Sequence, residues 1–428
     1  MTEASILFSM FMMIAIGLPI AVAILASALV GVWLLNGHLG FLNAALSLYD
    51  GATSFPLIAI PLFILAGALM NTGGISTRLI AFVSALIGFV RGGLAMVNVG
   101  VSLFFAEISG SAVADVAATG SVLIPAMKKK GYAPRFAAAL TSSSASLAII
   151  IPPSIPMILY GALSDTSIVR LFVAGIVPGL LGGGLLMALS YYFAVRYDLP
   201  REEGFSLCRL WKATKDAVWA LILPVIILGG IFGGIVTATE GAGLAVVASL
   251  FIGLFIYREL DFGKLYGALL DGVNQTATVM LLVAASAVLG LYLTETELPQ
   301  RLAAGITDIT TNKILVLMII NVFLLFVGMV LHGAAAIILT VPIFMPLVHQ
   351  MGIDPIQFGI LITLNIALGQ QTPPVASVLI TACSIAKTDV WSTTKTNLPF
   401  IGVLVLVLLL VTYVPAVPLS LVEAFYGQ

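Results

Sequence analysis

The chain has 428 residues, of which 61% are hydrophobic and only 9% are charged. A soluble globular protein carries roughly 25% charged residues, so this composition excludes an ordinary soluble domain. Apolar stretches of about 20 residues, long enough to cross a bilayer, recur from end to end, which predicts an all-α polytopic membrane protein. The net charge of −1 identifies no partner, and Cys208 and Cys383 show no metal-binding spacing.

The positions of Lys and Arg predict how the chain threads through the membrane. The start MTEAS lacks the basic region of a cleavable signal peptide, so residues 5–35 are expected to form a retained first helix. Cytoplasmic loops carry excess Lys and Arg. Nine crossings put 15 of the 18 basic residues inside, with the N-terminus inside and the C-terminus outside. The predicted crossings are residues 5–35, 52–72, 134–163, 168–195, 217–236, 238–257, 265–293, 356–386 and 396–417.

Two other stretches are apolar, residues 92–127 and 314–348. They fit this charge balance only if each enters and leaves the membrane on the same side. Each holds two apolar segments around a middle rich in Gly, Ser and Ala, which predicts two re-entrant hairpins. The amphipathic segments 77–90 and 298–311 are expected to lie along the membrane interface. The polar stretch 196–216 is expected to be a cytoplasmic loop between two halves of the chain.

The two halves share prolines and glycines at a fixed offset of 221 residues. The matched positions are Pro125 and Pro346, Gly131 and Gly352, Pro134 and Pro355, Leu140 and Leu361, Leu147 and Leu368, and Pro152-Pro153 and Pro373-Pro374. The charge balance puts the first proline-flanked turn inside and the second outside, so the halves are predicted to be inverted copies. Inverted repeats with matched interruptions indicate a secondary transporter with its site near the midplane.

The paired prolines are expected to break the helices 134–163 and 356–386. Freed carbonyl groups find no water in lipid, and a bound cation can satisfy them. The N-terminus of the second half-helix has free amides and a positive dipole end, which suit an anion. A simple kink, repaired by neighbouring helices, is the alternative. The polar residues beside the breaks are Ser154, Gln370, Gln371 and Thr372.

The hairpin tips are expected to face these breaks. The first tip is formed by Ser109, Gly110 and Ser111. At the second tip, a run of small residues begins at Gly333. Small residues let backbones approach closely. Hydroxyl and carbonyl oxygens suit a hard cation and do not titrate, which favours Na⁺ over a proton as the coupling ion.

Few ionisable residues lie inside the apolar segments, and such groups are functional candidates by default. They are Glu107, Asp115, Glu240 and His332. For Asp115, a role as acceptor for helix-start amides competes with a functional one. Glu240 is expected to cap a helix start through Thr237 or Thr239, and His332 is either a structural histidine or a substrate ligand.

Several segments resemble the large membrane subunit (the M subunit) of tripartite ATP-independent periplasmic (TRAP) transporters. They are residues 61–80, 91–99, 109–132, 151–161, 233–242, 352–360 and 372–375. The resemblance implies an elevator-type, Na⁺-driven importer of organic acids in a bacterial inner membrane. No cofactor is expected, and the charge balance puts the C-terminus on the periplasmic side. The resemblance also implies a separate four-helix membrane subunit and a periplasmic substrate-binding protein as partners.

The architecture further resembles divalent-anion/Na⁺ symporters, and this likeness implies two Na⁺ sites between tips and breaks. Their candidate residues are Ser109, Gly110, Ser111, Asp115, Pro152, Gly333, Ala334, Gln371, Thr372 and Val375. Candidate substrate ligands are Ser109, Ser111, Ser154, His332, Gln371 and Thr372. His332 stands where an acidic residue is common in the family, and Gln370 and Gln371 stand where aliphatic residues are common.

The expected organisation is a scaffold against which a transport domain moves. Its parts are scaffold 1–91, first transport repeat 92–195, loop 196–216, scaffold 217–312 and second transport repeat 313–428. A symporter that works without a binding protein and a channel are the alternatives. An intramembrane protease is disfavoured, because Ser109 has no placeable histidine partner and Asp115 has no matching aspartate. The scattered basic residues give no support for nucleic-acid binding.

Overall fold

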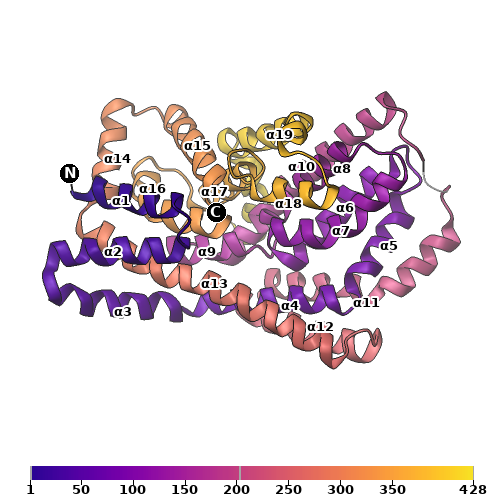
Figure 1. Cartoon of the computed structure of the whole chain (residues 1–428), viewed down its shortest axis with the longest axis horizontal. Helices are drawn as coiled ribbons and strands as arrows, with labels where there is room; N and C mark the ends of the chain where they lie inside the picture. Colours follow the sequence, from indigo (N-terminus) through magenta and orange to yellow (C-terminus); the bar gives the residue numbers. More distant parts are fainter. Residues whose placement is uncertain (1, 202–203, 428) are drawn as a thin grey trace.

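The computed structural model describes residues 2–201 and 204–427, with no side-chain description for residues 2–4, 107–109 and 309. Over these residues the chain is built of helices joined by turns and short loops (Figure 1). Nine of the described helical segments are long and apolar enough to cross a membrane. The predicted all-α polytopic membrane fold is therefore confirmed.

The N-terminal region differs from the prediction. Instead of one helix over 5–35, α1 (Thr2–Ala15) and α2 (Ile20–Asn36) lie antiparallel (Figure 1). Gly17 has a φ of +97°, a conformation that favours glycine, and Pro19 before α2 has no N–H to donate. The prediction of a single first helix was therefore wrong, because the chain turns back between Ala15 and Ile20.

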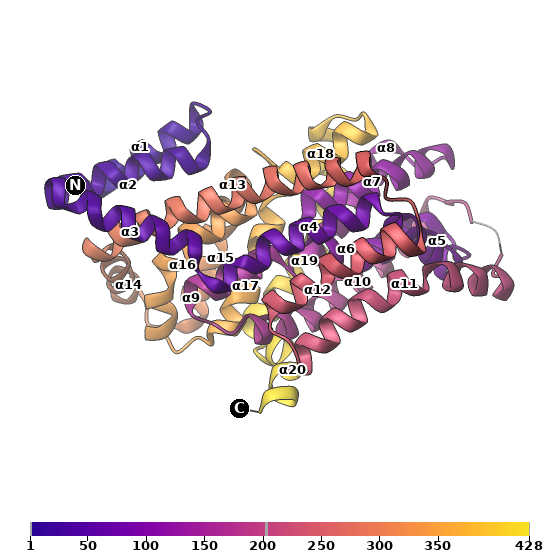
Figure 2. The ribbon, with the colours of Figure 1, turned by 90° about the horizontal axis from the view of Figure 1, so that it is seen from below.

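The remaining scaffold helices pack around one long helix. They are α3 (Gly40–Thr53), α4 (Ala59–Thr72), α5 (Ile75–Ile87), α11 (Leu207–Phe232), α12 (Ala238–Phe251), α13 (Phe262–Glu295) and α14 (Leu298–Ile309). α13 packs against α2, α3 and α4, while α12 packs on α4 and α11 on α5 (Figure 2). The scaffold contacts the rest of the molecule mainly through α4, α5, α13 and α14.

Each half of the chain contributes a helical hairpin, a broken helix and one further long helix. In the first half these are α6 (Gly93–Ser109), α7 (Ala112–Lys129), α8 (Pro134–Ala145), α9 (Ile155–Ser164) and α10 (Ile168–Arg196). In the second half they are α15 (Lys313–Val330), α16 (Gly333–Gln350), α17 (Pro355–Gly369), α18 (Ser377–Ala386) and α19 (Val390–Tyr413), followed by α20 (Ala416–Tyr426). Both hairpins and both breaks thus occur at their predicted positions.

The two halves exchange contacts in a reciprocal way. The second hairpin helix of the first half, α7, packs on α18, and its counterpart α16 packs on α9. In the same manner α19 packs on α8, and α10 packs on α17. Each broken helix is therefore held by elements from both halves, which brings both hairpin tips to the middle of the molecule.

Candidate functional site

A cavity of about 790 Å³ lies where the hairpin tips meet the first break and the scaffold; we call it the central cavity. The hairpins line it with residues 110–114, Ala117 and residues 332–335. The broken helices add Ile149, Ile155, Pro156 and Gln370. The scaffold wall consists of Pro19, Ile20, Ala21, Ile64, Asn274, Gln275, Thr278, Val279, Leu281 and Leu282. The two predicted tips therefore share one site.

Three helices begin at this cavity. α7 starts at Ala112, α9 at Ile155 and α16 at Gly333, and residues of each first turn line the wall. The first turn of a helix carries unpaired N–H groups and a partial positive charge. The sequence had indicated the half-helices after both breaks for this role, of which α9 lines the cavity and α18 does not, but it had not indicated the hairpin helices α7 and α16. Their convergence makes the cavity suited to a small anion.

The first broken helix closes its own gap with the side chain of Ser154. This residue is the N-cap of α9. Its hydroxyl donates to the carbonyl oxygen of Ile149 at 2.6 Å and accepts from the Met157 N–H at 3.5 Å. Ser154 is fully buried and does not line the central cavity. The hydroxyl that was expected to bind substrate instead satisfies the broken backbone.

The first hairpin tip lies against this break, as expected. Gly110 has a φ of +56°, and a Cβ built on it would lie 3.0 Å from the carbonyl oxygen of Pro153 and 3.3 Å from the Ile155 nitrogen. Only glycine fits so close an approach. Ser111 follows as the N-cap of α7 and lines the cavity, while the side chains of Glu107 and Ser109 lie outside the described residues.

The second break also meets its own hairpin. The backbone N–H of Val375 donates to the carbonyl oxygen of Met329 at 3.3 Å, just before the second tip. Gly369 and Gly328 bring α17 and α15 into backbone contact. Both Pro–Pro bonds, Pro152-Pro153 and Pro373-Pro374, are cis.

The glutamines beside the second break have different surroundings. Gln370 lines the central cavity, and a Cβ on Gly333 would lie 2.9 Å from its Nε2 atom, which has no hydrogen-bond partner among the described residues. Gln371 is buried away from the cavity, with its Oε1 atom 2.7 Å from the Ser143 hydroxyl and 3.2 Å from Asn397 Nδ2. Thr372 donates back to its own helix and does not line the cavity. The structure thus puts Gln370, rather than Gln371 or Thr372, at the cavity.

Two of the ionisable candidates lie at hairpin tips. His332 is the N-cap of α16, and its exposed side chain lines the cavity. Asp115, in the first turn of α7, is fully buried, and neither carboxylate oxygen has a hydrogen-bond partner among the described residues. The role of acceptor for helix-start amides is therefore not seen for Asp115. A buried unpaired carboxylate is costly, and a nearby cation would offset that cost.

Glu240 has the capping role that the sequence indicated. Its side chain accepts from the Thr237 N–H at 2.8 Å, and the Thr237 hydroxyl accepts from the Glu240 N–H at 3.2 Å. This reciprocal pair is a capping box. Glu240 therefore belongs to the start of α12 and not to the central cavity.

A buried asparagine ties the first helix of each hairpin to its broken helix. Asn98 Nδ2 donates to Thr141 Oγ1 at 2.7 Å, and the Ser144 hydroxyl donates to Asn98 Oδ1 at 2.9 Å. In the second half, Asn365 Nδ2 donates to Asn321 Oδ1 at 2.7 Å. Ser144 and Asn365 stand at the same offset of 221 residues as the prolines. Sequence analysis missed these residues, although each asparagine lies in an otherwise apolar stretch.

The scaffold contributes polar residues that the sequence analysis also missed. Asn274, Gln275 and Thr278 are exposed on α13 and line the central cavity. They follow one another in the segment NQTAT, inside a 34-residue apolar helix. Uncommitted polarity inside such a helix is the signal that marks them. They face the hairpin tips across the cavity.

Half-helices, hairpin tips and helix N-termini around a mainly apolar cavity with a few polar lining side chains define a secondary transport protein. Residues 7–417 match the family model of the DctM component of tripartite ATP-independent periplasmic transporters. The chain therefore belongs to this family, which confirms the resemblance read from the sequence motifs.

Relatives and a solved structure agree with this placement. The chain is 40% identical, over 97% of its length, to the isethionate TRAP transporter permease protein DctMQ of Oleidesulfovibrio alaskensis, of which it covers 65%. It is 38% identical to the C4-dicarboxylate TRAP transporter large permease protein DctM of Pseudomonas aeruginosa, with 89% of each chain covered. Its fold is similar to that of the YdaH transporter of Alcanivorax borkumensis, with a TM-score of 0.64, 16% identity, and 95% and 97% of the two chains covered. At this identity the likeness to YdaH concerns the fold alone.

Proposed function

We propose that this chain imports a small organic acid anion, coupled to Na⁺, as the translocating subunit of its tripartite transporter. The observation that carries the proposal is the convergence of the N-termini of α7, α9 and α16 on the central cavity. None of the lining residues within the described part of the chain is Lys or Arg. Backbone N–H groups and helix dipoles, with His332 and Gln370, would therefore hold the anion.

The substrate class follows from the cavity and from the relatives together. A relative named for isethionate and one named for C4-dicarboxylates are almost equally similar to this chain. Both ligands are small anions of organic acids. Three converging helix N-termini are suited to bind an anion of this kind. The class is therefore proposed without choosing a member of it.

Two Na⁺ positions are proposed, one at each pairing of a tip with a break. The first would lie between Gly110 and the break at residues 152–154, and the Asp115 carboxylate, in the first turn of α7, is proposed as a further ligand. The second would lie between residues 333–334 and the break at residues 371–375, where Val375 already bonds to the second hairpin. Carbonyl, hydroxyl and carboxylate oxygens are the ligands that hard cations prefer. Na⁺ bound there would order the walls of the central cavity.

Removal of Na⁺ tests the coupling. Proteoliposomes with the small membrane subunit and the binding protein are expected to lose uptake of labelled substrate when external Na⁺ is replaced by choline. A ligand drives a conformational equilibrium only by differential affinity for its states, so net import needs the Na⁺ gradient. Undiminished uptake in choline would disprove the coupling.

An elevator mechanism and an inverted repeat are part of the proposal. The reciprocal contacts of α7 with α18 and α16 with α9 support one moving transport domain, residues 92–195 with 313–428. The matched bonds of Asn98 and Asn321 support two related halves. α13 and the start of α2 would form the fixed wall. Movement of the tips past Asn274 and Gln275 would then expose the bound substrate to the opposite side of the membrane.

The family and the relative named DctMQ support a partnership with a small membrane subunit and a periplasmic binding protein. The excess of basic residues on one side of the predicted crossings supports a periplasmic C-terminus in a bacterial inner membrane. A symporter that needs no binding protein is the alternative. Saturable uptake that stops when the binding protein is omitted would exclude both that alternative and a channel.

The two neighbouring glutamines are expected to respond differently to substitution. Gln370→Leu removes an amide from the cavity, so the KM for uptake is expected to rise about tenfold or more, since a hydrogen bond to a charged group contributes roughly 1.5–3 kcal/mol. Gln371→Leu removes the oxygen to which Ser143 and Asn397 both donate. Ser143 still donates to Asn397 Oδ1 at 2.7 Å, but Asn397 Nδ2 loses its acceptor, which costs about 1–3 kcal/mol of stability. The KM of Gln371→Leu is expected to rise less than that of Gln370→Leu, while its Tm falls further. If Gln371→Leu raised the KM more and Gln370→Leu mainly lowered the Tm, the placement of Gln370 at the cavity would be wrong.

A further inference from the structure

A second cavity, which shares no lining residue with the central cavity, lies between α5, α11 and the turn after α12; we call it the basic pocket. Its volume is about 770 Å³. Its charged lining residues are Arg78, Arg209, Lys212, Lys215, Asp216 and Glu259. With four cations and two carboxylates, the pocket carries a net positive charge. No part of the transport mechanism uses it.

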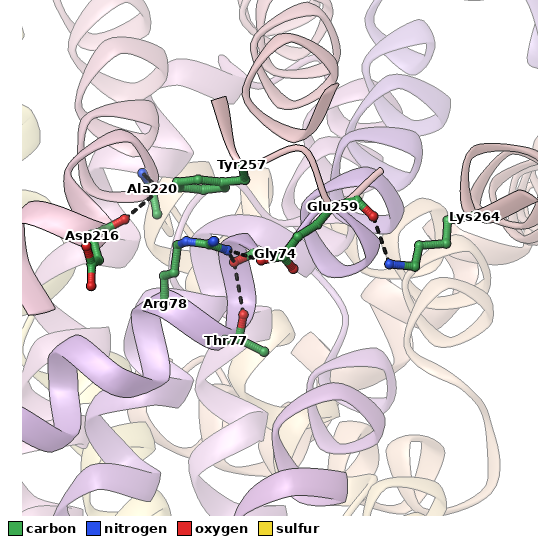
Figure 3. Close-up of polar contacts among 8 residues, drawn as sticks. All are labelled: Gly74, Thr77, Arg78, Asp216, Ala220, Tyr257, Glu259 and Lys264. Atoms are coloured by element: carbon green, nitrogen blue, oxygen red, sulfur yellow. Dashed lines mark hydrogen bonds and ion pairs between the residues drawn. The ribbon is translucent and has the colours of Figure 1, made fainter. Parts of the chain in front are cut away.

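One wall of the basic pocket is fixed by internal contacts (Figure 3). Arg78 pairs with Glu259 at 2.7 Å, donates to the Gly74 carbonyl oxygen at 2.8 Å and stacks on the Tyr257 ring at 3.8 Å. The Tyr257 hydroxyl donates to the carbonyl oxygen of Asp216 at 3.1 Å. The charge of Arg78 is therefore already balanced, and this side of the pocket is preorganised.

The opposite wall carries cations that are not balanced in this way. Lys212 and Lys215 lie one turn apart on the same face of α11, in register with Arg209. Both lysines are exposed, and neither ammonium group has a hydrogen-bond or ion-pair partner among the described residues. Two uncommitted charges on one face can bind a phosphate group.

The pocket continues into an apolar surface. Trp219 and Ile256 line the pocket. Trp219 is 45% exposed, and Ile222, which follows it on α11, is 38% exposed. Tryptophan is enriched at the level of lipid headgroups. A ligand that fits both walls has an anionic head and an apolar tail, which favours a lipid over free phosphate.

We propose that the basic pocket binds the headgroup of an anionic glycerophospholipid. Its phosphate would lie at Lys212 and Lys215, and its acyl chains would run along Trp219 and the apolar face of α11. Basic pockets between membrane helices recognise such headgroups. A lipid held there would fasten α5 and α11 to the membrane interface, on the side where basic residues gather.

The test uses the full chain purified in a neutral detergent, with its Tm followed by tryptophan fluorescence. Dioctanoyl phosphatidylglycerol is expected to raise the Tm saturably, while dioctanoyl phosphatidylcholine and inorganic phosphate at the same concentrations have no such effect. An equal response to phosphatidylcholine would overturn charge recognition. An equal response to inorganic phosphate would show a free-phosphate site and overturn the lipid assignment.

Charge variants locate the effect. The double change Lys212→Gln and Lys215→Gln is expected to weaken the apparent affinity roughly 30-fold, since each lysine near an anionic surface contributes about five- to sixfold. The double change Lys212→Arg and Lys215→Arg keeps both positive charges and is expected to bind the lipid about as tightly as the unmodified protein. The matched control, Lys129→Gln with Lys387→Gln, removes two exposed charges outside the pocket. A loss of affinity in this control as large as in the pocket variant would overturn the site.

Discussion

Asp115→Asn is expected to remove the stabilisation that comes from the first proposed Na⁺ position and to weaken the apparent Na⁺ affinity for uptake by at least tenfold. The Asp115 carboxylate is fully buried and unpaired among the described residues. A unit charge about 4 Å from a cation contributes about 4 kcal/mol at an effective dielectric constant of 20, more than the ~1.4 kcal/mol that a tenfold change requires. The measurement is the Tm of the purified chain over a Na⁺ titration, followed by uptake over the same range.

The control for this variant is Glu240→Gln. It also neutralises a carboxylate within an apolar helix, but one whose role is to cap α12 with Thr237. It is expected to lower the Tm at every Na⁺ concentration and to keep the Na⁺-dependent rise. If Asp115→Asn kept the full rise as well, Asp115 would have no part in Na⁺ binding.

Gly369→Ala is expected to cause a large loss of stability and of uptake. A Cβ at this position would lie 2.5 Å from the Gly328 Cα and 2.7 Å from the Met329 nitrogen, both backbone atoms that cannot turn aside. α17 would have to move away from α15, and the second hairpin tip would leave the break. Overpacking of a buried contact costs about 1–3 kcal/mol or more. The Tm of the purified protein and the initial rate of uptake measure the effect.

Gly402→Ala in α19 is the matched control, because no other atom lies within 4 Å of a Cβ built there. In a helix interior this change is neutral or slightly stabilising. Wild-type stability and uptake in Gly369→Ala would show that the close approach of α15 and α17 is dispensable.

The hairpins and breaks could be predicted from sequence because proline and charge act locally. Pro152-Pro153 and Pro373-Pro374 interrupt a helix whatever surrounds them, and the predicted hairpins 92–127 and 314–348 end within a few residues of the observed helices. The break at Gly17 and Pro19 was missed, because membrane helices tolerate a single Gly or Pro and nothing in the repeat marked this one.

Side-chain directions beside a break could not be predicted. Spacing fixes the direction of a side chain only in a regular helix or strand, and Ser154 and residues 370–372 lie where the helix ends. Ser154 therefore points to a backbone carbonyl, and Gln370 and Gln371 point to different surroundings. Asn274 and Gln275 stand out in the sequence as polar residues inside an apolar helix, but their place opposite the tips follows from the packing of α13, a tertiary contact that no local pattern records.

The reciprocal packing of α7 on α18 and of α16 on α9 has a consequence for biogenesis. When α7 and α9 leave the ribosome, the helices that cover them have yet to be synthesised. The first hairpin must wait in the bilayer with its small-residue face towards lipid or towards an insertion factor. A chain truncated before α16 is therefore expected to be recognised by membrane quality control, and expression of the two halves as separate polypeptides is expected to restore the fold only when both are made together.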